Sequence, residues 1–176
     1  MQATQHRSTT TESDCFVGRR MAAIVFVDIV SSTEALLGMT DRAWVEVLDA
    51  LDATTERLVA ELDGTISNRL GDGYLVLFDG ASRAVRFGEL LVAATAELDI
   101  ELRVGVHAGE VESQGSQTVG ASVHAAARIQ SAAEPGEILV SESVTILTLG
   151  SGLEFLPRGE RELKGLPGRW RLWTLA

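Results

Sequence analysis

Cysteine, lysine and long hydrophobic runs are scarce in this 176-residue sequence. Its only cysteine, Cys15, cannot form an internal disulfide. The longest apolar run, Met21 to Val27, is much shorter than the roughly 18 residues that a membrane-spanning helix needs. Residues 1–20 are polar and lack the apolar stretch of a secretory signal peptide. These absences predict a cytoplasmic protein that does not enter a membrane.

The charge balance is strongly acidic. The chain has 25 acidic and 15 basic residues and a net charge of −10, so a broad basic surface for nucleic acid is not expected. A small anionic ligand is still compatible, because a bound metal and a few arginines can dominate one pocket. Lys164 is the only lysine, so almost every local cation is an arginine. The length and the hydrophobic fraction of 45% fit a single domain.

Residues 1–20 are predicted to form a disordered polar tail, and residues 21–176 the folded domain. Apolar patterning predicts strands at 20–28, 65–70, 74–78, 100–108 and 137–140, and two or three short strands between 153 and 175. Helices are expected from 31 to 62, where Ser31 and Glu34 have capping-box spacing, and over 81–97, 120–133 and 141–147. Gly109 is predicted to turn the chain, and 115–119 to form a loop.

This order, β-α-β-β-α-β followed by a small C-terminal α/β extension, predicts an α/β (α+β) fold with a ferredoxin-like split core. Asp28 ends the first strand, and Asp72 lies in a Gly-Asp-Gly hairpin. Strands in this order can lie side by side and bring the two carboxylates together. Such a pair, with a main-chain carbonyl, suits Mg²⁺ or Mn²⁺. Each aspartate also has a simpler interpretation: Asp72 as a turn residue, and Asp28 as an acceptor for main-chain N–H groups.

Five ordered blocks carry a resemblance to a known family: IVFVDIVSSTE, GTISNRLGDGYLVLFDG, LRVGVHAGEVE, VGASVHAAARIQSAAEPGEILVSESV and RGERELKGLPGRWRLW. Together they resemble the catalytic domain of class III adenylate/guanylate cyclases, of the short actinobacterial type. The resemblance runs from about Met21 to the C-terminus. It implies conversion of a nucleoside triphosphate to a cyclic 3′,5′-nucleotide and pyrophosphate. It also implies two Mg²⁺ or Mn²⁺ ions per site, held by Asp28, Asp72 and the carbonyl of Ile29.

The resemblance implies roles for further residues. Arg128 corresponds to the arginine that stabilises charge on the α-phosphate in the transition state, and His124 stands where many members carry a ribose-orienting asparagine. His124 and Arg128 are four apart, so on a helix they share one face. The triphosphate is expected to contact Arg103, Lys164 and the predicted helix start at Ser31, Ser32 and Thr33. Arg128 could otherwise be a solvated helix arginine, and His124 a packing residue.

Two positions depart from the family pattern. The base-reading lysine is replaced by Asn68, and its partner carboxylate by Gln117. A Lys/Asp pair suits adenine, whereas each of these amides carries both donors and acceptors and can flip. Weak or relaxed base selection and low activity are therefore expected; ATP is the default substrate and GTP the alternative.

The site is also expected to be shared between two protomers. Asn68 and Asp72 are four residues apart, about 13 Å along an extended strand. Unless the hairpin folds sharply, these two residues of one protomer are not expected to contact opposite ends of the same substrate molecule. The resemblance implies a symmetric homodimer with two sites at its interface. The main alternative is a nucleotide-binding regulatory dimer without efficient turnover. A diguanylate cyclase is disfavoured because the Gly-Gly-Asp/Glu-Glu-Phe block is missing, and a carboxylate-pair hydrolase would not explain the five blocks.

Overall fold

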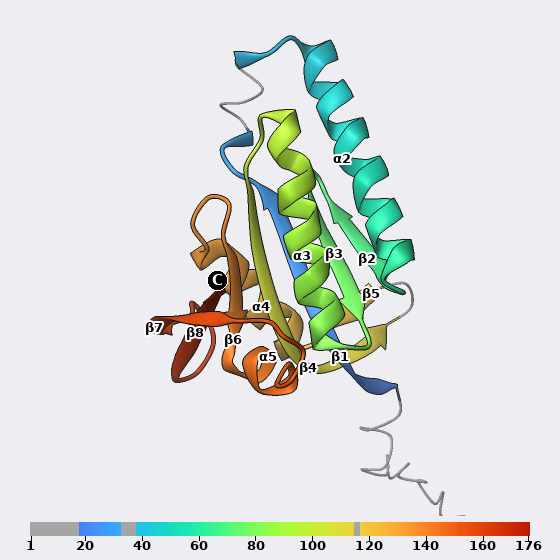
Figure 1. Cartoon of the computed structure of the whole chain (residues 1–176). Coiled ribbons are helices and arrows are strands. Elements are labelled where there is room, and N and C mark those ends of the chain that lie inside the picture. Colours follow the sequence, from blue (N-terminus) through green and yellow to red (C-terminus); the bar gives the residue numbers. More distant parts are fainter. Residues whose placement is uncertain (1–17, 33–37, 115–116) are drawn as a thin grey trace, which may run out of the picture.

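The computed structural model describes residues 18–32, 38–114 and 117–176 (Figure 1). Its strands are β1 (Arg19–Ile29), β2 (Thr65–Leu70), β3 (Gly73–Phe78), β4 (Leu102–Gln114), β5 (Gln117–Val119), β6 (Ile138–Ser141), β7 (Phe155–Glu162) and β8 (Arg169–Leu175). Its helices are α2 (Asp41–Glu61), α3 (Ala81–Thr95), α4 (Ala121–Ala132) and α5 (Glu142–Leu147), with a 3₁₀ turn at Ala96–Leu98. No helix within these ranges has the length and apolar character that crossing a membrane requires.

The strands form one sheet in the order β2-β3-β1-β4-β6-β8-β7, and β5 pairs with β4. The first four strands have the order expected of the split β-α-β-β-α-β core, with β1 antiparallel to both β3 and β4. The ferredoxin-like prediction is therefore confirmed. β6 runs parallel to β4, and β7 and β8 extend the sheet as an antiparallel hairpin, which is the predicted C-terminal extension.

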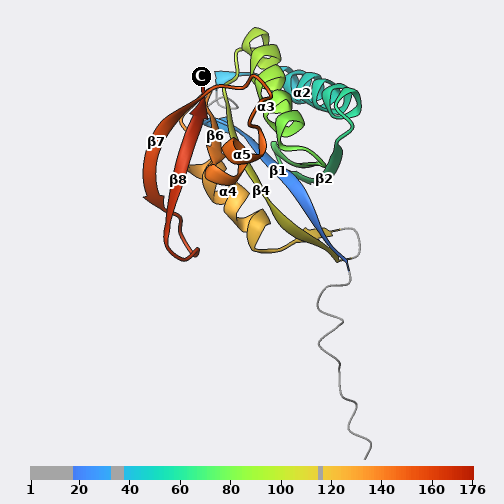
Figure 2. The ribbon, with the colours of Figure 1, turned by 60° about the horizontal axis from the view of Figure 1, so that its bottom comes forward.

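Helices cover both faces of the sheet. α2 and α3 lie on one face, and α4 crosses β1 and β4 on the other (Figures 1 and 2). Successive side chains of a strand point to opposite faces. On β1, Val25 and Val27 are therefore buried under α2 and α3, whereas Ile24 is buried on the α4 side. Asp28 follows Ile24 by an even number of residues, so its carboxylate projects on the α4 side.

The two helices that the sequence predicts before and after the β2–β3 hairpin are present as α2 and α3. In α2, Thr40 caps the N-terminus by accepting from the Ala43 amide, and Leu51 and Leu58 bury the apolar stripe. The capping-box prediction at Ser31 and Glu34 reaches into residues 33–37, outside the described part of the chain. The same holds for the predicted tail, of which residues 1–17 lie outside it.

Three details differ from the sequence prediction. β1 begins at Arg19, because Arg19 and Arg20 pair with Glu112 and Val111. The chain does not turn at Gly109: β4 continues through it to Gln114. Gly109 instead gives space to α4, since a Cβ there would lie 2.4 Å from the hydroxyl oxygen of Ser122. Residues 117–119 form β5 rather than a loop.

Candidate active site

Asp28 and Asp72 meet at one end of the sheet. Strands β1 and β3 are neighbours, with Val27 opposite Tyr74, and Asp72 directly precedes β3. The approach is close at Gly73, where a Cβ would lie 2.4 Å from the Val27 carbonyl oxygen and 3.5 Å from Oδ1 of Asp28. Only a glycine fits there. The sheet therefore brings the two carboxylates together, as the strand order predicted.

The Asp28 carboxyl is in an unusual electrostatic environment. Burial raises its pKa, and the nearby charge of Asp72 raises it further. Arg103 and a hydrogen bond from Gln130 act in the opposite direction. A partly buried carboxylate whose charge is disfavoured by a neighbouring carboxylate is a favourable place for a cation. Hard oxygen donors fit Mg²⁺ or Mn²⁺.

The side chains at this end of the sheet can supply only part of the coordination shell of a metal ion. The described ranges contain no group of three or more His, Cys, Asp or Glu side chains that could hold a metal. A cation held by Asp28 and Asp72 would therefore need main-chain carbonyls, such as that of Ile29, and oxygens from a ligand. Sites that bind metal together with substrate phosphates have this composition.

Arg103 extends the charge pattern beside the carboxylates. It is the cross-strand partner of Asp28 in β4, so both side chains project on the α4 face. The Nε atom of Arg103 is buried and has no hydrogen-bond partner among the described residues. A buried donor without a partner is costly. This donor, next to a carboxylate pair suited to a cation, fits a ligand that carries negative charge.

Sequence reasoning missed Gln130. This residue of α4 is 9% exposed, and its side chain acts on Asp28 to lower the pKa of that carboxyl, which favours the charged form. The Ser131 hydroxyl donates to Oε1 of Gln130 at 3.5 Å. A faint signal exists in the sequence: the small residues of β4 and α4 indicate close packing of the helix on the sheet.

His124 and Arg128 share one face of α4, as predicted, but it is the exposed face. The buried face is made by Ala125, Ala126, Ile129 and Gln130. At 100° per residue, His124 and Arg128 project roughly opposite to this face. One protomer therefore does not bring these two side chains to its own Asp28 and Asp72.

Asn68 and Gln117 belong to a second group. Both side chains are exposed, Asn68 on β2 and Gln117 at the start of β5. The two strands meet through a hydrogen bond of 2.7 Å between the hydroxyls of Ser67 and Thr118, the residues next to them. The structure thus brings the main chain of the two candidates together, while strand alternation places Asn68 on the α4 face and Gln117 on the opposite one.

Comparisons with known proteins agree with this arrangement. The family described as "Adenylate and Guanylate cyclase catalytic domain" matches residues 19–176. The chain belongs to this family. A putative adenylate cyclase 3 of Rhizobium meliloti is 32% identical over 90% of this chain and 28% of its own length. An adenylate cyclase of Streptomyces coelicolor is 34% identical over 70% of this chain and 33% of its own. The chain thus spans about a third or less of these relatives.

The fold agrees as well. The crystal structure of the adenylyl cyclase CyaB from P. aeruginosa superposes with a TM-score of 0.81 at 22% identity, covering 90% of this chain and 94% of that one. In this cyclase domain the five sequence blocks occupy β1, the β2–β3 hairpin, β4, the segment from β5 to α5, and the β7–β8 hairpin. The blocks that carry the family resemblance are therefore also the elements that build and flank the carboxylate end of the sheet.

The remaining candidates of the cyclase domain lie at its periphery. Ser31 is exposed, has a φ of 50° and comes two residues after Ile29; Ser32 is half-buried, and Thr33 lies outside the described residues. Lys164 projects from the turn between β7 and β8 and is exposed. This turn is attached to the domain through Leu163, which packs with Ile129 of α4.

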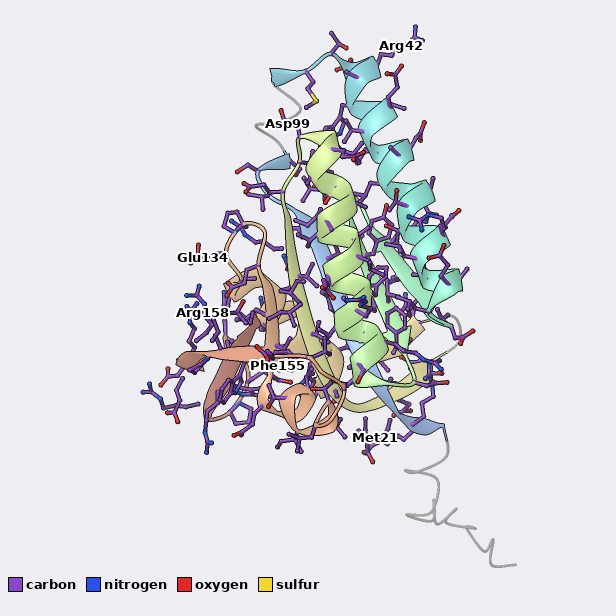
Figure 3. The ribbon with its side chains drawn as sticks, in the orientation of Figure 1. Met21, Arg42, Asp99, Glu134, Phe155 and Arg158 are labelled. Carbon is purple, nitrogen blue, oxygen red and sulfur yellow. The ribbon has the colours of Figure 1, made fainter. Side chains whose placement is uncertain are left out.

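Figure 3 labels Met21 near one end of the sheet and Asp99 near the other. The carboxylates of Asp28 and Asp72 lie toward the Asp99 end, where β4 begins.

Proposed function

We propose that this domain converts a purine nucleoside triphosphate to a cyclic 3′,5′-nucleotide and pyrophosphate. The observation that carries the proposal is the pairing of Asp28 and Asp72 at adjacent strand ends, with Arg103 across the strand from Asp28. The ribose 3′ oxygen attacks the α-phosphorus, the bond to the pyrophosphate oxygen breaks with that oxygen leaving on pyrophosphate, and the 3′ proton passes to solvent water. Phosphoryl transfers of this kind depend mainly on positioning and on charge neutralisation.

In this proposal Asp28, Asp72 and the Ile29 carbonyl hold two Mg²⁺ or Mn²⁺ ions. Bound there, the ions lower the pKa of the 3′ hydroxyl and neutralise triphosphate charge. Arg103, with its buried and unpartnered Nε, contacts the triphosphate. Lys164 and the Ser31–Thr33 segment are assigned to the same ligand by family resemblance.

The proposed active form is a homodimer with two shared sites. Its support is the outward position of His124 and Arg128, which face away from the carboxylates of their own chain. In a two-fold dimer the same residues are presented to the other protomer. Arg128 then stabilises charge on the α-phosphate, and His124 orients the ribose.

ATP is the proposed main substrate, because the relatives named above are adenylate cyclases. Asn68 and Gln117 read the base. Since each amide offers donors and acceptors, GTP is expected to be accepted as well. The competing proposal is a dimer that binds nucleotide without efficient turnover, and the departures at these two positions are what favour it.

The test is a product assay for cyclic AMP and cyclic GMP with ATP or GTP and with Mn²⁺ or Mg²⁺. Asp72→Asn should lower the rate by more than the roughly 100-fold that the loss of an outer-shell partner of a metal can cause. Asp79→Asn is the matched control, because Asp79 follows the other end of β3 and is exposed. No product from the wild-type protein, together with measurable nucleotide binding, would favour the regulatory dimer.

A further inference from the structure

We infer that the hydroxyl pair of Ser67 and Thr118 positions Asn68 and thereby sets how the site distinguishes purine bases. The inference rests on the proposed function, because it concerns the base-reading part of that site. Ser67 and Thr118 are positioning residues: each precedes or follows a base-reading amide by one residue and is not itself assigned a contact with the nucleotide.

The first observation is a β-bulge at Ser67. In the β2–β3 hairpin, Ile66 pairs with Val76 and Asn68 pairs with Leu75, so Ser67 is the extra residue. Without the bulge Asn68 would pair with Tyr74. Tyr74 packs under α2 and α3, and the residue opposite it shares that face.

The bulge therefore decides which face Asn68 occupies. Leu75 is buried on the α4 side, so its partner Asn68 also projects there, on the same face as Asp28 and Arg103. A shift of one residue in a strand moves a side chain to the opposite face. Had the register continued, Asn68 would have faced α2, away from the candidate site.

The second observation is what keeps the bulge in place. Ser67 and Thr118 are 51 residues apart in sequence, and their hydroxyls lie 2.7 Å apart in a partly buried contact. β2 is an edge strand of the sheet, whereas β5 pairs with the end of β4. The hydroxyl contact thus joins two elements that the main chain does not pair.

Asn68 and Gln117 flank this contact directly. Asn68 projects on the α4 face, whereas Gln117 pairs with Gln114, three residues after Val111 of that face, and so projects on the opposite one. An amide can present a donor or an acceptor to a base by rotating. Asn68 is therefore the amide whose place on the α4 face the contact can hold, so the contact should influence the choice between adenine and guanine.

The experiment compares Ser67→Ala, Thr118→Val and the double variant with the wild-type protein. The measured quantity is the ATP-to-GTP ratio of kcat/KM, and in parallel the ratio of the two nucleotide Kd values. We expect either single variant to change the ratio about 3- to 10-fold, the range expected for one neutral hydrogen bond. The double variant should change it no further, because both substitutions remove the same contact. Thr118→Ser, which keeps the hydroxyl, should retain the wild-type ratio.

Two controls separate this role from general destabilisation. Thr145→Val and Ser151→Ala remove hydroxyls that bond only to main-chain groups in α5 and in the loop after it; they should leave the ratio unchanged. If Ser67→Ala and Thr118→Val lower the melting temperature but leave the ratio unchanged, the inference is wrong. If the wild-type protein forms no product, the proposed function fails, and the Kd ratios still decide the inference.

Discussion

Gly105 of β4 and Gln130 of α4 are in direct main-chain contact: a Cβ on Gly105 would lie 2.2 Å from the Gln130 nitrogen and 2.5 Å from its Cα. Nothing flexible lies in between. The absence of a side chain at position 105 lets α4 approach the sheet closely enough for the Gln130 side chain to reach Asp28. One glycine thus determines the position of a helix that carries Gln130 inward and Arg128 outward.

Gly105→Ala should therefore both destabilise the domain and reduce its activity. Forcing one methyl group into this contact requires α4 to shift, at a cost of about 1–3 kcal/mol. Urea denaturation measures the loss of stability, and the product assay measures the effect of moving Arg128. Gly38→Ala is the control, since a Cβ at Gly38 has no neighbour within 4 Å and its φ is not positive; it should not lower stability. Equal effects of the two substitutions would contradict the packing argument.

His107 should make stability depend on pH. Its side chain is 8% exposed, its Nδ1 lies 2.8 Å from the Ser141 hydroxyl, and its ring packs edge-on against Trp170. Burial lowers the pKa of His107 to about 4. The unfolded chain, with a pKa near 6.5, therefore binds more protons between these values, so stability is complete above pH 6.5 and decreases as the pH falls toward 4.

The measurement is the free energy of unfolding at pH 7.5 and at pH 5, for the wild-type protein and for His107→Gln. Between these values the wild type should lose about 2 kcal/mol more than the variant, from 1.36 kcal/mol per pKa unit. Carboxyl groups that titrate in the same range, including Asp28 with its raised pKa, are common to both proteins and cancel in the difference. An identical loss in both proteins would show that His107 does not titrate in this way.

Tyr74 should anchor the hairpin that carries Asp72. Its ring is buried, its hydroxyl donates to Asp52 of α2, and Arg69 of β2 pairs with the same carboxylate. Burial raises the pKa of Tyr74 well above 10, and the bond to Asp52 adds to this, so the hydroxyl remains a donor at any working pH. Tyr74→Phe keeps the ring and loses this bond, which should cost about 1.5–3 kcal/mol, as for hydrogen bonds to charged groups.

A double-mutant cycle tests this assignment. Thermal unfolding of Tyr74→Phe, Asp52→Ala and the double variant should be clearly non-additive, because both single changes remove one bond. Purely additive effects would mean that the Tyr74 hydroxyl contributes through some other contact. In the product assay, Tyr74→Phe should need a higher concentration of Mg²⁺ or Mn²⁺ for half-maximal activity. The reason is that Asp72 lies two residues before Tyr74, at the tip of the same hairpin.

The sequence identified the candidate metal ligands where a carboxylate stands at a position with a clear local structural signal. Asp28 after seven apolar residues, and Asp72 between two glycines, were identifiable because strand ends and tight turns have clear local signals. The strand order then predicted their approach. The end of β4 was not predicted correctly, because a glycine such as Gly109 usually indicates a turn. In the structure, Gly109 instead leaves space for the side chain of Ser122 in α4.

Long-range contacts were not predictable. The effect of Gln130 on the Asp28 carboxyl joins positions about a hundred residues apart, and no local pattern near either one indicates it. The bulge at Ser67 is similar: the run from Thr65 to Leu70 has the pattern of a regular strand, and the hydroxyl partner of Ser67, Thr118, lies far along the chain. Such features depend on how distant elements pack, which a single sequence does not specify.

Mixing two inactive variants should restore activity if the sites are shared. Asp72→Asn removes a carboxylate from the buried side of the site, and Arg128→Ala removes a side chain from the exposed face of α4. In a mixed dimer of the two, one site carries both defects and the other carries neither. With equal amounts and free exchange, half of the dimers are mixed and one of their two sites is intact, so about a quarter of the wild-type rate is expected.

Each variant alone gives the baseline, and a mixture of Asp72→Asn with Asp28→Asn is the matched control. Both of these changes lie in the same half of the site, so every mixed dimer retains a defect in each site and no recovery is expected. If Asp72→Asn and Arg128→Ala fail to complement each other while size-exclusion chromatography shows mixed dimers, then Arg128 acts within its own chain or not at all. In that case the exposed face of α4 would need another explanation, because Arg128 points away from the carboxylates of its own protomer.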